Sequence, residues 1–179
     1  PSSDATSASH ALRKKWGHYL GATLYYEGEW YWGIDRLHHL EDRLNDLGLG
    51  QTNVNTHLFP ASQYANCKVT PQNTSIDFFF SFRSPYSAIS AAKIFHWAHQ
   101  AGVHIKLRYV LPMVMRGLPV PAEKRKYIIL DAAREAYVQG VPFGRLNDPV
   151  GNPTERGLAL MPFAEMHNLA EDYVMSFMQ

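Results

Sequence analysis

The stretch over residues 76–94 constrains the fold more than any other part of the chain. Residues 76–80 form an apolar run interrupted only by an acid, which is typical of a central strand covered on both faces. Ser84-Pro-Tyr-Ser87 follows, and the small and apolar residues after it predict a helix. A hydroxyl at the start of that helix faces backbone N–H groups without internal partners and the positive end of the helix dipole. Such a turn can hold an anion or a thiolate.

The segments after this turn predict a β-α-β unit and then a helical block. Gly102 ends the helix, and residues 103–109 alternate apolar with basic side chains, which is the period of a strand. Parallel strands with a right-handed crossover are therefore expected. The helical block has a helix over 123–139, a short helix that Thr154 caps and that breaks near Pro162, and a helix over 167–178.

The first part of the chain predicts a β-β-α order. Residues 1–9 are small and polar, and we interpret them as a flexible tail. Residues 22–26 and 29–32 have the aromatic and β-branched character of strands, and Glu27-Gly28 between them signals a hairpin turn. A helix over 34–47 carries an apolar stripe of leucines, with His38 and His39 expected on different faces.

Residues 51–73 are rich in Asn, Gln, Thr and Ser and show no period, so they predict a linker. The chain is therefore expected to hold a ββα segment over 1–50, this linker over 51–73, and a βαβ segment with its helical block over 74–179. The predicted fold class is α/β.

The composition narrows the choice of partners. With 18% charged residues, a net charge of +1 and no long basic run, the chain gives no sign of binding nucleic acid or an acidic membrane surface. No apolar run reaches the roughly 20 residues of a membrane span. A lone cysteine, Cys67, excludes an internal disulfide and a CxxC redox pair, and we expect a reducing, cytoplasmic setting.

The order of strand, Ser84-Pro-Tyr-Ser87 and helix resembles the active-site layout of the thioredoxin fold, with serines at both positions of a Cys-Pro-Tyr-Cys motif. Lys124-x-x-Tyr127 and Asp131-x-x-Arg134 extend the pattern. This combination of motifs is similar to that of the 2-hydroxychromene-2-carboxylate isomerases and kappa-class glutathione transferases of the DsbA-like thioredoxin family. That family inserts a helical domain after its β-α-β unit and then returns with β-β-α.

Residues 21–37, which end in Gly33-Ile-Asp-Arg-Leu37, resemble the closing β-β-α segment of the same family. The chain thus carries the family's end before its beginning. One interpretation is a piece of a tandem protein, with the tail of one thioredoxin-like domain and the front of the next. The other is a single permuted or swapped domain whose halves close on each other, within one chain or in a homodimer.

The resemblance implies a catalytic role for Ser84, which would hydrogen-bond the sulfur of glutathione and favour its thiolate. Asp35 would hold the glutamyl ammonium, and Lys124 would lie near the site. Ala22 and Thr23 would present backbone to the γ-glutamyl–cysteinyl part of glutathione. Plainer roles stay open: Ser84 as a helix N-cap, Asp35 as a partner of the helix dipole, and Lys124 as a solvated helix start.

The chain departs from the family at two positions. Ala22 stands where the family has a cis-proline, and a cis bond before a non-proline residue costs about 3 kcal/mol, so a trans bond is expected. The family's asparagine ahead of its proline-containing loop is replaced by Gly117-Leu118.

Other candidates are weaker. Arg83 either attracts a carboxylate substrate or is simply exposed. His96 and His99 lie one helical turn apart, but no third ligand accompanies them, so no metal site is predicted. The aromatic run Trp30-Tyr-Trp32 is interpreted as hairpin packing rather than a platform for bases.

The resemblance implies a glutathione-dependent isomerase or transferase, in which the thiolate adds to a small electrophilic aromatic substrate. The alternative is a non-catalytic thioredoxin-like module that binds a peptide or partner through the same face. Disulfide exchange is disfavoured because neither position 84 nor position 87 is a cysteine.

Overall fold

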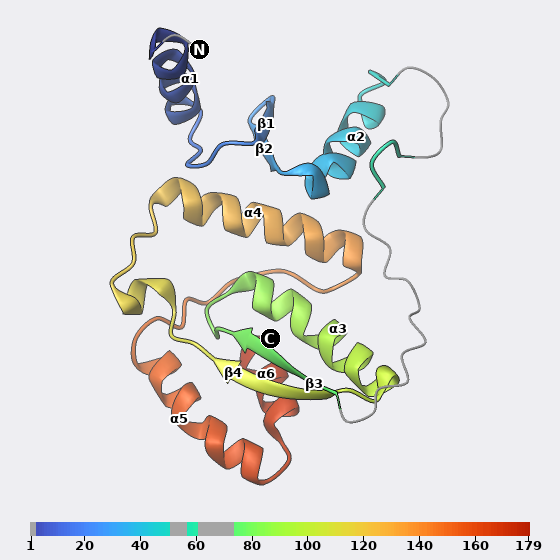
Figure 1. Cartoon of the computed structure of the whole chain (residues 1–179), viewed down its shortest axis with the longest axis vertical. Coiled ribbons are helices and arrows are strands. Elements are labelled where there is room, and N and C mark those ends of the chain that lie inside the picture. Colours follow the sequence, from blue (N-terminus) through green and yellow to red (C-terminus); the bar gives the residue numbers. More distant parts are fainter. Residues whose placement is uncertain (1–2, 51–56, 61–73) are drawn as a thin grey trace. The chain divides into compact units, whose positions relative to one another are not determined.

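The structure is a computed structural model that describes residues 3–50, 57–60 and 74–179 (Figure 1). Within these ranges it is a mixed α/β protein with six α-helices and two small two-stranded sheets. The chain divides into two compact units. The first holds the described residues up to Pro60 and Ala122–Tyr127, and the second holds residues 74–121 and 128–179. The predicted linker over 51–73 lies outside the described residues, except for 57–60.

Helix α1 (Ser3–Lys15) stands where a flexible tail is predicted, so that prediction was wrong for residues 3–9. Asp4 lies in the first turn, and basic residues occupy the last turn, which suits the helix dipole. Ala5, Ala8 and Ala11 add strong helix propensity. None of the helix residues is buried. The small, polar side chains of this segment therefore predict its exposure correctly but not its helical backbone.

Strands β1 (Thr23–Tyr26) and β2 (Glu29–Trp32) form the predicted antiparallel hairpin. Both turn residues have positive φ, 41° at Glu27 and 90° at Gly28, as a type I′ turn requires. On one face, the ring of Trp16 stacks on Tyr25 with 4.4 Å between centroids, and Trp30 Nε1 donates to the Trp16 carbonyl at 3.1 Å. The indole of Trp30 is thus part of the packing of the hairpin.

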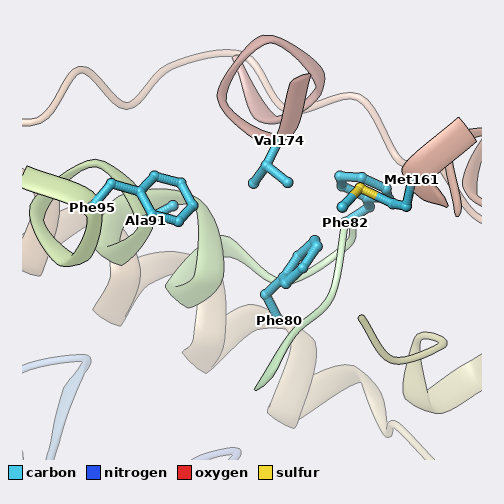
Figure 2. Packing of buried hydrophobic residues seen from close by; sticks show 6 residues of the cluster. All are labelled: Phe80, Phe82, Ala91, Phe95, Met161 and Val174. Atoms are coloured by element: carbon cyan, nitrogen blue, oxygen red, sulfur yellow. The ribbon is translucent and has the colours of Figure 1, made fainter. Parts of the chain in front are cut away.

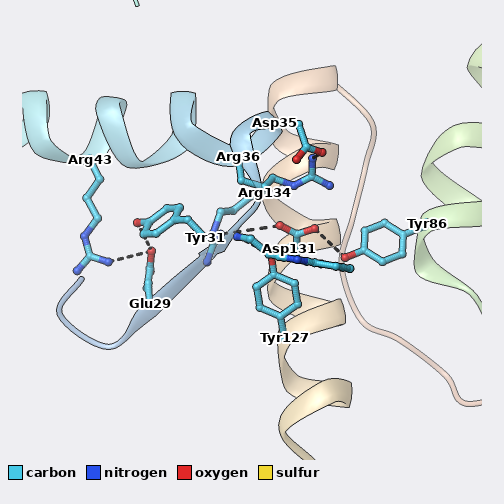
Figure 3. A network of polar contacts seen from close by, with 10 residues as sticks. Glu29, Tyr31, Asp35, Arg36, Arg43, Tyr86, Tyr127, Asp131 and Arg134 are labelled. Carbon is cyan, nitrogen blue, oxygen red and sulfur yellow. Dashed lines mark hydrogen bonds and ion pairs between the residues drawn. The ribbon is translucent and has the colours of Figure 1, made fainter. Parts of the chain in front are cut away.

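The other face of the hairpin packs on α2 (Leu37–Asp46), which follows the 3-10 helix η1 (Ile34–Arg36). Arg43 reaches the hairpin turn, where its guanidinium lies 2.9 Å from Glu29 and 5.3 Å from the centre of the Tyr26 ring. The hydroxyl of Tyr31, which is buried, donates to the same Glu29 carboxylate at 2.9 Å (Figure 3). These contacts fix the register of α2 against the strands.

Helix α2 buries His38 and His39 in place of the predicted leucine stripe. Their ring centroids are 3.9 Å apart, so the expectation that they point to different faces was wrong. Leu47, at the end of the predicted stripe, is 52% exposed. The 3-10 turn at the start has fewer residues per turn than an α-helix, and it changes which side chains of the following helix face inward.

In the second unit, β3 (Ser75–Phe80), α3 (Pro85–Ala101) and β4 (His104–Tyr109) form the predicted β-α-β unit with parallel strands. Gly102 ends α3 with a φ of 65°, and the Val103 N–H donates to the Ala98 carbonyl at 2.9 Å. This left-handed end is the reason that glycine is suited to the position. The 3-10 helix η2 (Met113–Arg116) then leads toward α4 (Ala122–Gln139).

The core of the second unit lies on one face of this sheet (Figure 2). Helices α3, α5 (Asn152–Met166) and α6 (Ala170–Met178) pack there with the strands. The buried side chains of the cluster are Phe80, Phe82, Ala91, Phe95, Met161 and Val174.

The opposite face of the sheet is open among the described residues, and the prediction of a strand covered on both faces was wrong there. Phe79 is 67% exposed, and Asp77, Lys106 and Arg108 on the same face are exposed too. Asp77 pairs with Arg108 at 2.5 Å across the strands. Successive side chains of a strand point to opposite faces, so a run of phenylalanines does not tell whether one face or both are covered.

The helical block differs from the prediction at α5. Thr154 is not its N-cap: the helix begins after Gly151, and the Thr154 hydroxyl donates to the Pro149 carbonyl at 2.6 Å. Pro162 lies inside α5 without ending it, and the chain breaks only after Met166. Pro162 forfeits one backbone hydrogen bond, but the buried neighbour Met161 anchors that turn in the core. Helix α4 ends at Gly140, as predicted.

Candidate functional site

Ser84 lies in the tight turn between β3 and α3. Its N–H donates to the Ser81 carbonyl at 2.9 Å, and its hydroxyl oxygen accepts the N–H of Ser87 at 3.2 Å. Pro85 occupies the first helical position, where its missing N–H costs nothing. The plainer expectation for Ser84, that of a helix N-cap, is thus confirmed. Since the oxygen accepts, its proton is available to donate, and no acceptor for it is recorded among the described residues.

Two further serines complete the turn. Ser87 Oγ accepts the N–H of Ser81 at 3.3 Å, so the hydroxyl one turn into the helix closes the loop from the other side. Ser81 Oγ is buried and has no hydrogen-bond partner among the described residues. Leaving a buried hydroxyl unpaired costs about 1–3 kcal/mol.

Tyr86 connects the start of α3 to α4. Its hydroxyl donates to the Asp131 carboxylate at 2.7 Å, and Asp131 is only 1% exposed (Figure 3). Arg134 lies 4.0 Å from the same carboxylate. A buried carboxylate needs such donors, so this pair fixes the orientation of the Ser84 turn.

Arg83 forms an ion pair with Asp148 in the loop before α5. Its Nε and Nη2 bind both oxygens of Asp148, at 2.7 and 2.8 Å. The hydrogen bond to Asp148 raises the pKa of Arg83 above its ordinary value. This bidentate pair connects the turn to the loop before α5, so Arg83 is not simply exposed. A role for Arg83 in attracting a carboxylate substrate stays a prediction.

The residues implied for the glutamyl end of glutathione lie in the first unit. Ala22 has a φ of 54°, and the peptide bonds of the described residues are all trans, as expected for the bond before it. Its carbonyl accepts the Gly33 N–H at 3.1 Å, next to the pairing of Thr23 with Trp32. Asp35 lies in η1, where its carboxylate is 2.7 Å from Arg36 and 64% exposed.

Lys124 also belongs to the first unit, in the first turns of α4. Its ammonium lies 5.8 Å from the centre of the Tyr19 ring, a cation–π distance. Tyr127, one turn on, accepts the N–H of Trp32 at 3.2 Å. The start of α4 is therefore more than a solvated helix end, because it packs on the hairpin.

The predicted site residues are thus divided between the units. Ala22, Thr23, Asp35 and Lys124 belong to the first unit, and Ser84 belongs to the second. The residue predicted to bind a thiolate lies at the start of α3, and the residues predicted to contact the glutamyl end lie in the hairpin, η1 and the first turns of α4.

His18 is a buried polar residue that no sequence pattern indicates. It is 4% exposed, its Nδ1 accepts the Leu20 N–H at 3.2 Å, and its Nε2 has no hydrogen-bond partner among the described residues. The Trp30 and Tyr127 rings lie 4.6 and 5.0 Å away. Burial lowers the pKa of His18, and Arg13 lowers it further, against the raising effect of its backbone contact at Leu20. The imidazole is thus held neutral.

The histidines of α3 and the lone cysteine are the remaining candidates for a functional site. His99 Nε2 lies 3.0 Å from Glu171, so its side chain is engaged across α3 and α6. His96, one turn away, is exposed. Cys67 lies outside the described residues.

No protein-family model matches this chain, and comparisons with curated proteins and with solved structures find no match either. Among the described residues, none of the helices has the length and apolar character needed to cross a membrane.

Proposed function

We propose that the Ser84 turn binds a thiolate, and that the protein is a glutathione-dependent isomerase or transferase of thioredoxin-like architecture, working in a reducing, cytoplasmic setting. One observation carries the proposal. Ser84 Oγ accepts the Ser87 N–H, which leaves its own proton free to donate at the positive end of α3. A donor and a positive potential are what a thiol needs in order to ionise near neutral pH.

The expected effect on the thiol follows from two contributions. A hydrogen bond to a charged group is worth about 1.5–3 kcal/mol, and the end of a helix adds about 0.3–1 kcal/mol. Solvent at the partly exposed turn weakens both. A net effect of about 2 kcal/mol lowers the pKa of a bound thiol by about 1.5 units, since one unit is 1.36 kcal/mol. A thiol with an ordinary pKa of about 8.5 would then be about half ionised at pH 7, against a few per cent in free solution.

The residues of the turn fit the sulfur of glutathione, because Ser84 offers a donor and Ser81 Oγ a buried polar group that lacks a partner. The charge of Arg83 at this turn is paired with Asp148. The resemblance assigns the glutamyl contacts to Asp35 and Lys124, which belong to the first unit. Bound glutathione would supply the nucleophilic sulfur that adds to an electrophilic aromatic carbon.

A calorimetric titration of the whole chain with glutathione tests the proposal. We expect heat of binding, and weaker binding of S-methyl glutathione, whose sulfur cannot ionise. An absence of heat at millimolar glutathione contradicts the proposal. Insulin reduction serves as a second assay: it should be blank, because no cysteine stands at position 84 or 87.

The second candidate, a non-catalytic binding module, is favoured by the open face of the β3–β4 sheet. Phe79 is 67% exposed there, and with the exposed Lys106 and Arg108 beside it this face offers apolar and charged groups to a partner. Failure of glutathione binding would favour this alternative.

A further inference from the structure

A groove of about 680 Å³ lies beside β4, between this strand and the turn that joins α5 to α6. Its lining residues all belong to the second unit. One wall is the strand itself, over residues 104–108, and the other includes Glu165, Asn168 and the first turn of α6. In Figure 1, α5 lies on the side of β4 away from β3.

The edge of β4 that faces this groove carries unpaired backbone groups. The N–H of His104 donates to the carbonyl of Thr74, just before β3, at 3.1 Å, and the N–H of Val110 donates to the carbonyl of Phe80 in β3 at 2.8 Å. Bonds in a parallel ladder recur at every second residue, so the intervening Lys106 and Arg108 also face β3. The N–H and C=O groups of Ile105 and Leu107 therefore point into the groove. Within residues 3–50, 57–60 and 74–179, β3 is the one strand that pairs with β4.

The two walls carry opposite charge. Lys106 stands on the open face of the sheet and has no ion-pair partner among the described residues, while its neighbour Arg108 is bound to Asp77. Glu165 and Asp172 line the wall formed by α5 and α6, and neither has a recorded cation partner in the described part of the chain. Glu171 also lines the groove and contacts His99 at 3.0 Å.

We propose that the β4 edge binds an extended peptide by strand addition, and that this peptide alternates acidic with basic side chains. Main-chain bonds to Ile105 and Leu107 give such binding its affinity, and alternate side chains give it specificity. Acidic side chains of the peptide lie on the open face against Lys106. Basic side chains lie on the other face and reach Glu165 and Asp172, with their aliphatic stems over the half-buried Ile105 and Leu107.

A second copy of this chain fits the same edge poorly. Antiparallel pairing of two β4 strands about Leu107 places Lys106 of each copy opposite Arg108 of the other. Like charges directly opposite each other on one face destabilise a strand pair. The charge pattern therefore selects a peptide with acids at these positions.

The test uses the whole chain and a fluorescent eight-residue peptide of alternating Glu and Lys, with both ends blocked. Binding is followed by fluorescence anisotropy at low salt. Two further versions carry N-methyl groups, one on every Lys and one on every Glu. In an added strand, only alternate N–H groups face β4. We expect one methylated version to bind at least about tenfold more weakly and the other to bind as the parent does. The methylated version that loses affinity identifies whether the added strand is parallel or antiparallel to β4.

Two controls address the charges. A block peptide of four Glu followed by four Lys has the same composition and cannot match both walls, so it should bind at least about tenfold more weakly. Lys106→Glu, an exposed substitution, should weaken the alternating peptide without altering glutathione binding. Equal effects of the two methylations, equal affinity for the block peptide, or self-association of the chain in place of peptide binding would overturn the proposal.

Discussion

The hydroxyl oxygen of Ser84 accepts the backbone N–H of Ser87 at 3.2 Å, so one side chain both caps helix α3 and presents a proton to the turn in front of it. The two roles can be separated by mutation. Ser84→Ala removes both the cap and the donor. We expect it to lower the free energy of unfolding by about 1 kcal/mol and to abolish glutathione binding, measured by urea titration and calorimetry.

Ser84→Asp is the matched variant. Aspartate is as good an N-cap as serine, and its charge suits the helix dipole, so stability should stay within about 0.5 kcal/mol of the parent. The same charge repels a thiolate, so glutathione binding should still be lost. Glutathione binding by Ser84→Asp at the parent's affinity would mean that Ser84 does not contact the sulfur.

The contact between Tyr86 and Asp131 predicts a second effect. Tyr86→Phe keeps the ring but removes the hydroxyl that donates to this buried carboxylate at 2.7 Å. We expect a loss of about 1–3 kcal/mol in the free energy of unfolding, because a buried charge is left with a missing donor. Tyr137→Phe, at an 87% exposed position on the same helix as Asp131, is the control and should change stability little. An unchanged urea midpoint for Tyr86→Phe would contradict this account.

His18 predicts how the stability of the first unit depends on pH. Its pKa in the folded state lies below the ordinary value of 6.5, mainly because of burial. Between 6.5 and the lowered pKa, the unfolded chain binds a proton that the folded chain does not, so stability falls as the pH falls through this window. Above it, the full stability is present. His18→Gln keeps an acceptor for the Leu20 N–H and should flatten this dependence.

The measurement uses tryptophan fluorescence in a Trp97→Phe background, because Trp16, Trp30 and Trp32 belong to the first unit and Trp97 to the second. His57 provides a control of opposite sign. Its hydrogen bond to Asp42 raises its pKa, so its contribution is present below 6.5 and is lost as the pH rises through the raised value. His57→Gln should leave the acid-side dependence intact. An identical acid-side slope in His18→Gln would contradict the role of His18.

Gly157 predicts a packing effect between α5 and α6. A Cβ at this position would lie 2.5 Å from the Phe177 ring, which packs on Phe82 with 4.0 Å between centroids. Gly157→Ala should therefore destabilise by about 1–3 kcal/mol, despite the higher helix propensity of alanine. The double variant Gly157→Ala with Phe177→Leu should lose less than the two single losses added together. Strict additivity in urea unfolding would show that the two side chains do not compete for space.

Much of the second unit could be predicted from local patterns. The strand, turn and helix around Ser84 have their own signals, and Gly102 and Gly140 end their helices because the chain must turn left-handed there. The N-cap role of Ser84 needs only residues within three positions of it. Such features depend on short stretches of chain, so the sequence is enough to find them.

The rest depends on contacts that a local pattern does not contain. Phe79 and Phe80 look alike in the sequence, yet one is 67% exposed and the other 1%, because helices cover only one face of their sheet. The sequence predicts Thr154 as a cap, but Thr154 lies inside α5, and its hydroxyl donates to the carbonyl of Pro149 in the loop before the helix. Aromatic rings from the hairpin and α4 bury His18, and no residue spacing in the sequence predicts this burial. Each of these outcomes is set by tertiary packing.

The central claim is that Ser84 lowers the pKa of a bound glutathione thiol. Ultraviolet absorbance of the thiolate, recorded from acid to alkaline pH with glutathione limiting and protein in excess, measures this directly. We expect the apparent pKa of the thiol to fall by about 1.5 units in the parent chain, and to keep its value for free glutathione in Ser84→Ala and Ser84→Asp. A thiol that titrates in the parent chain as it does in free solution would contradict the account.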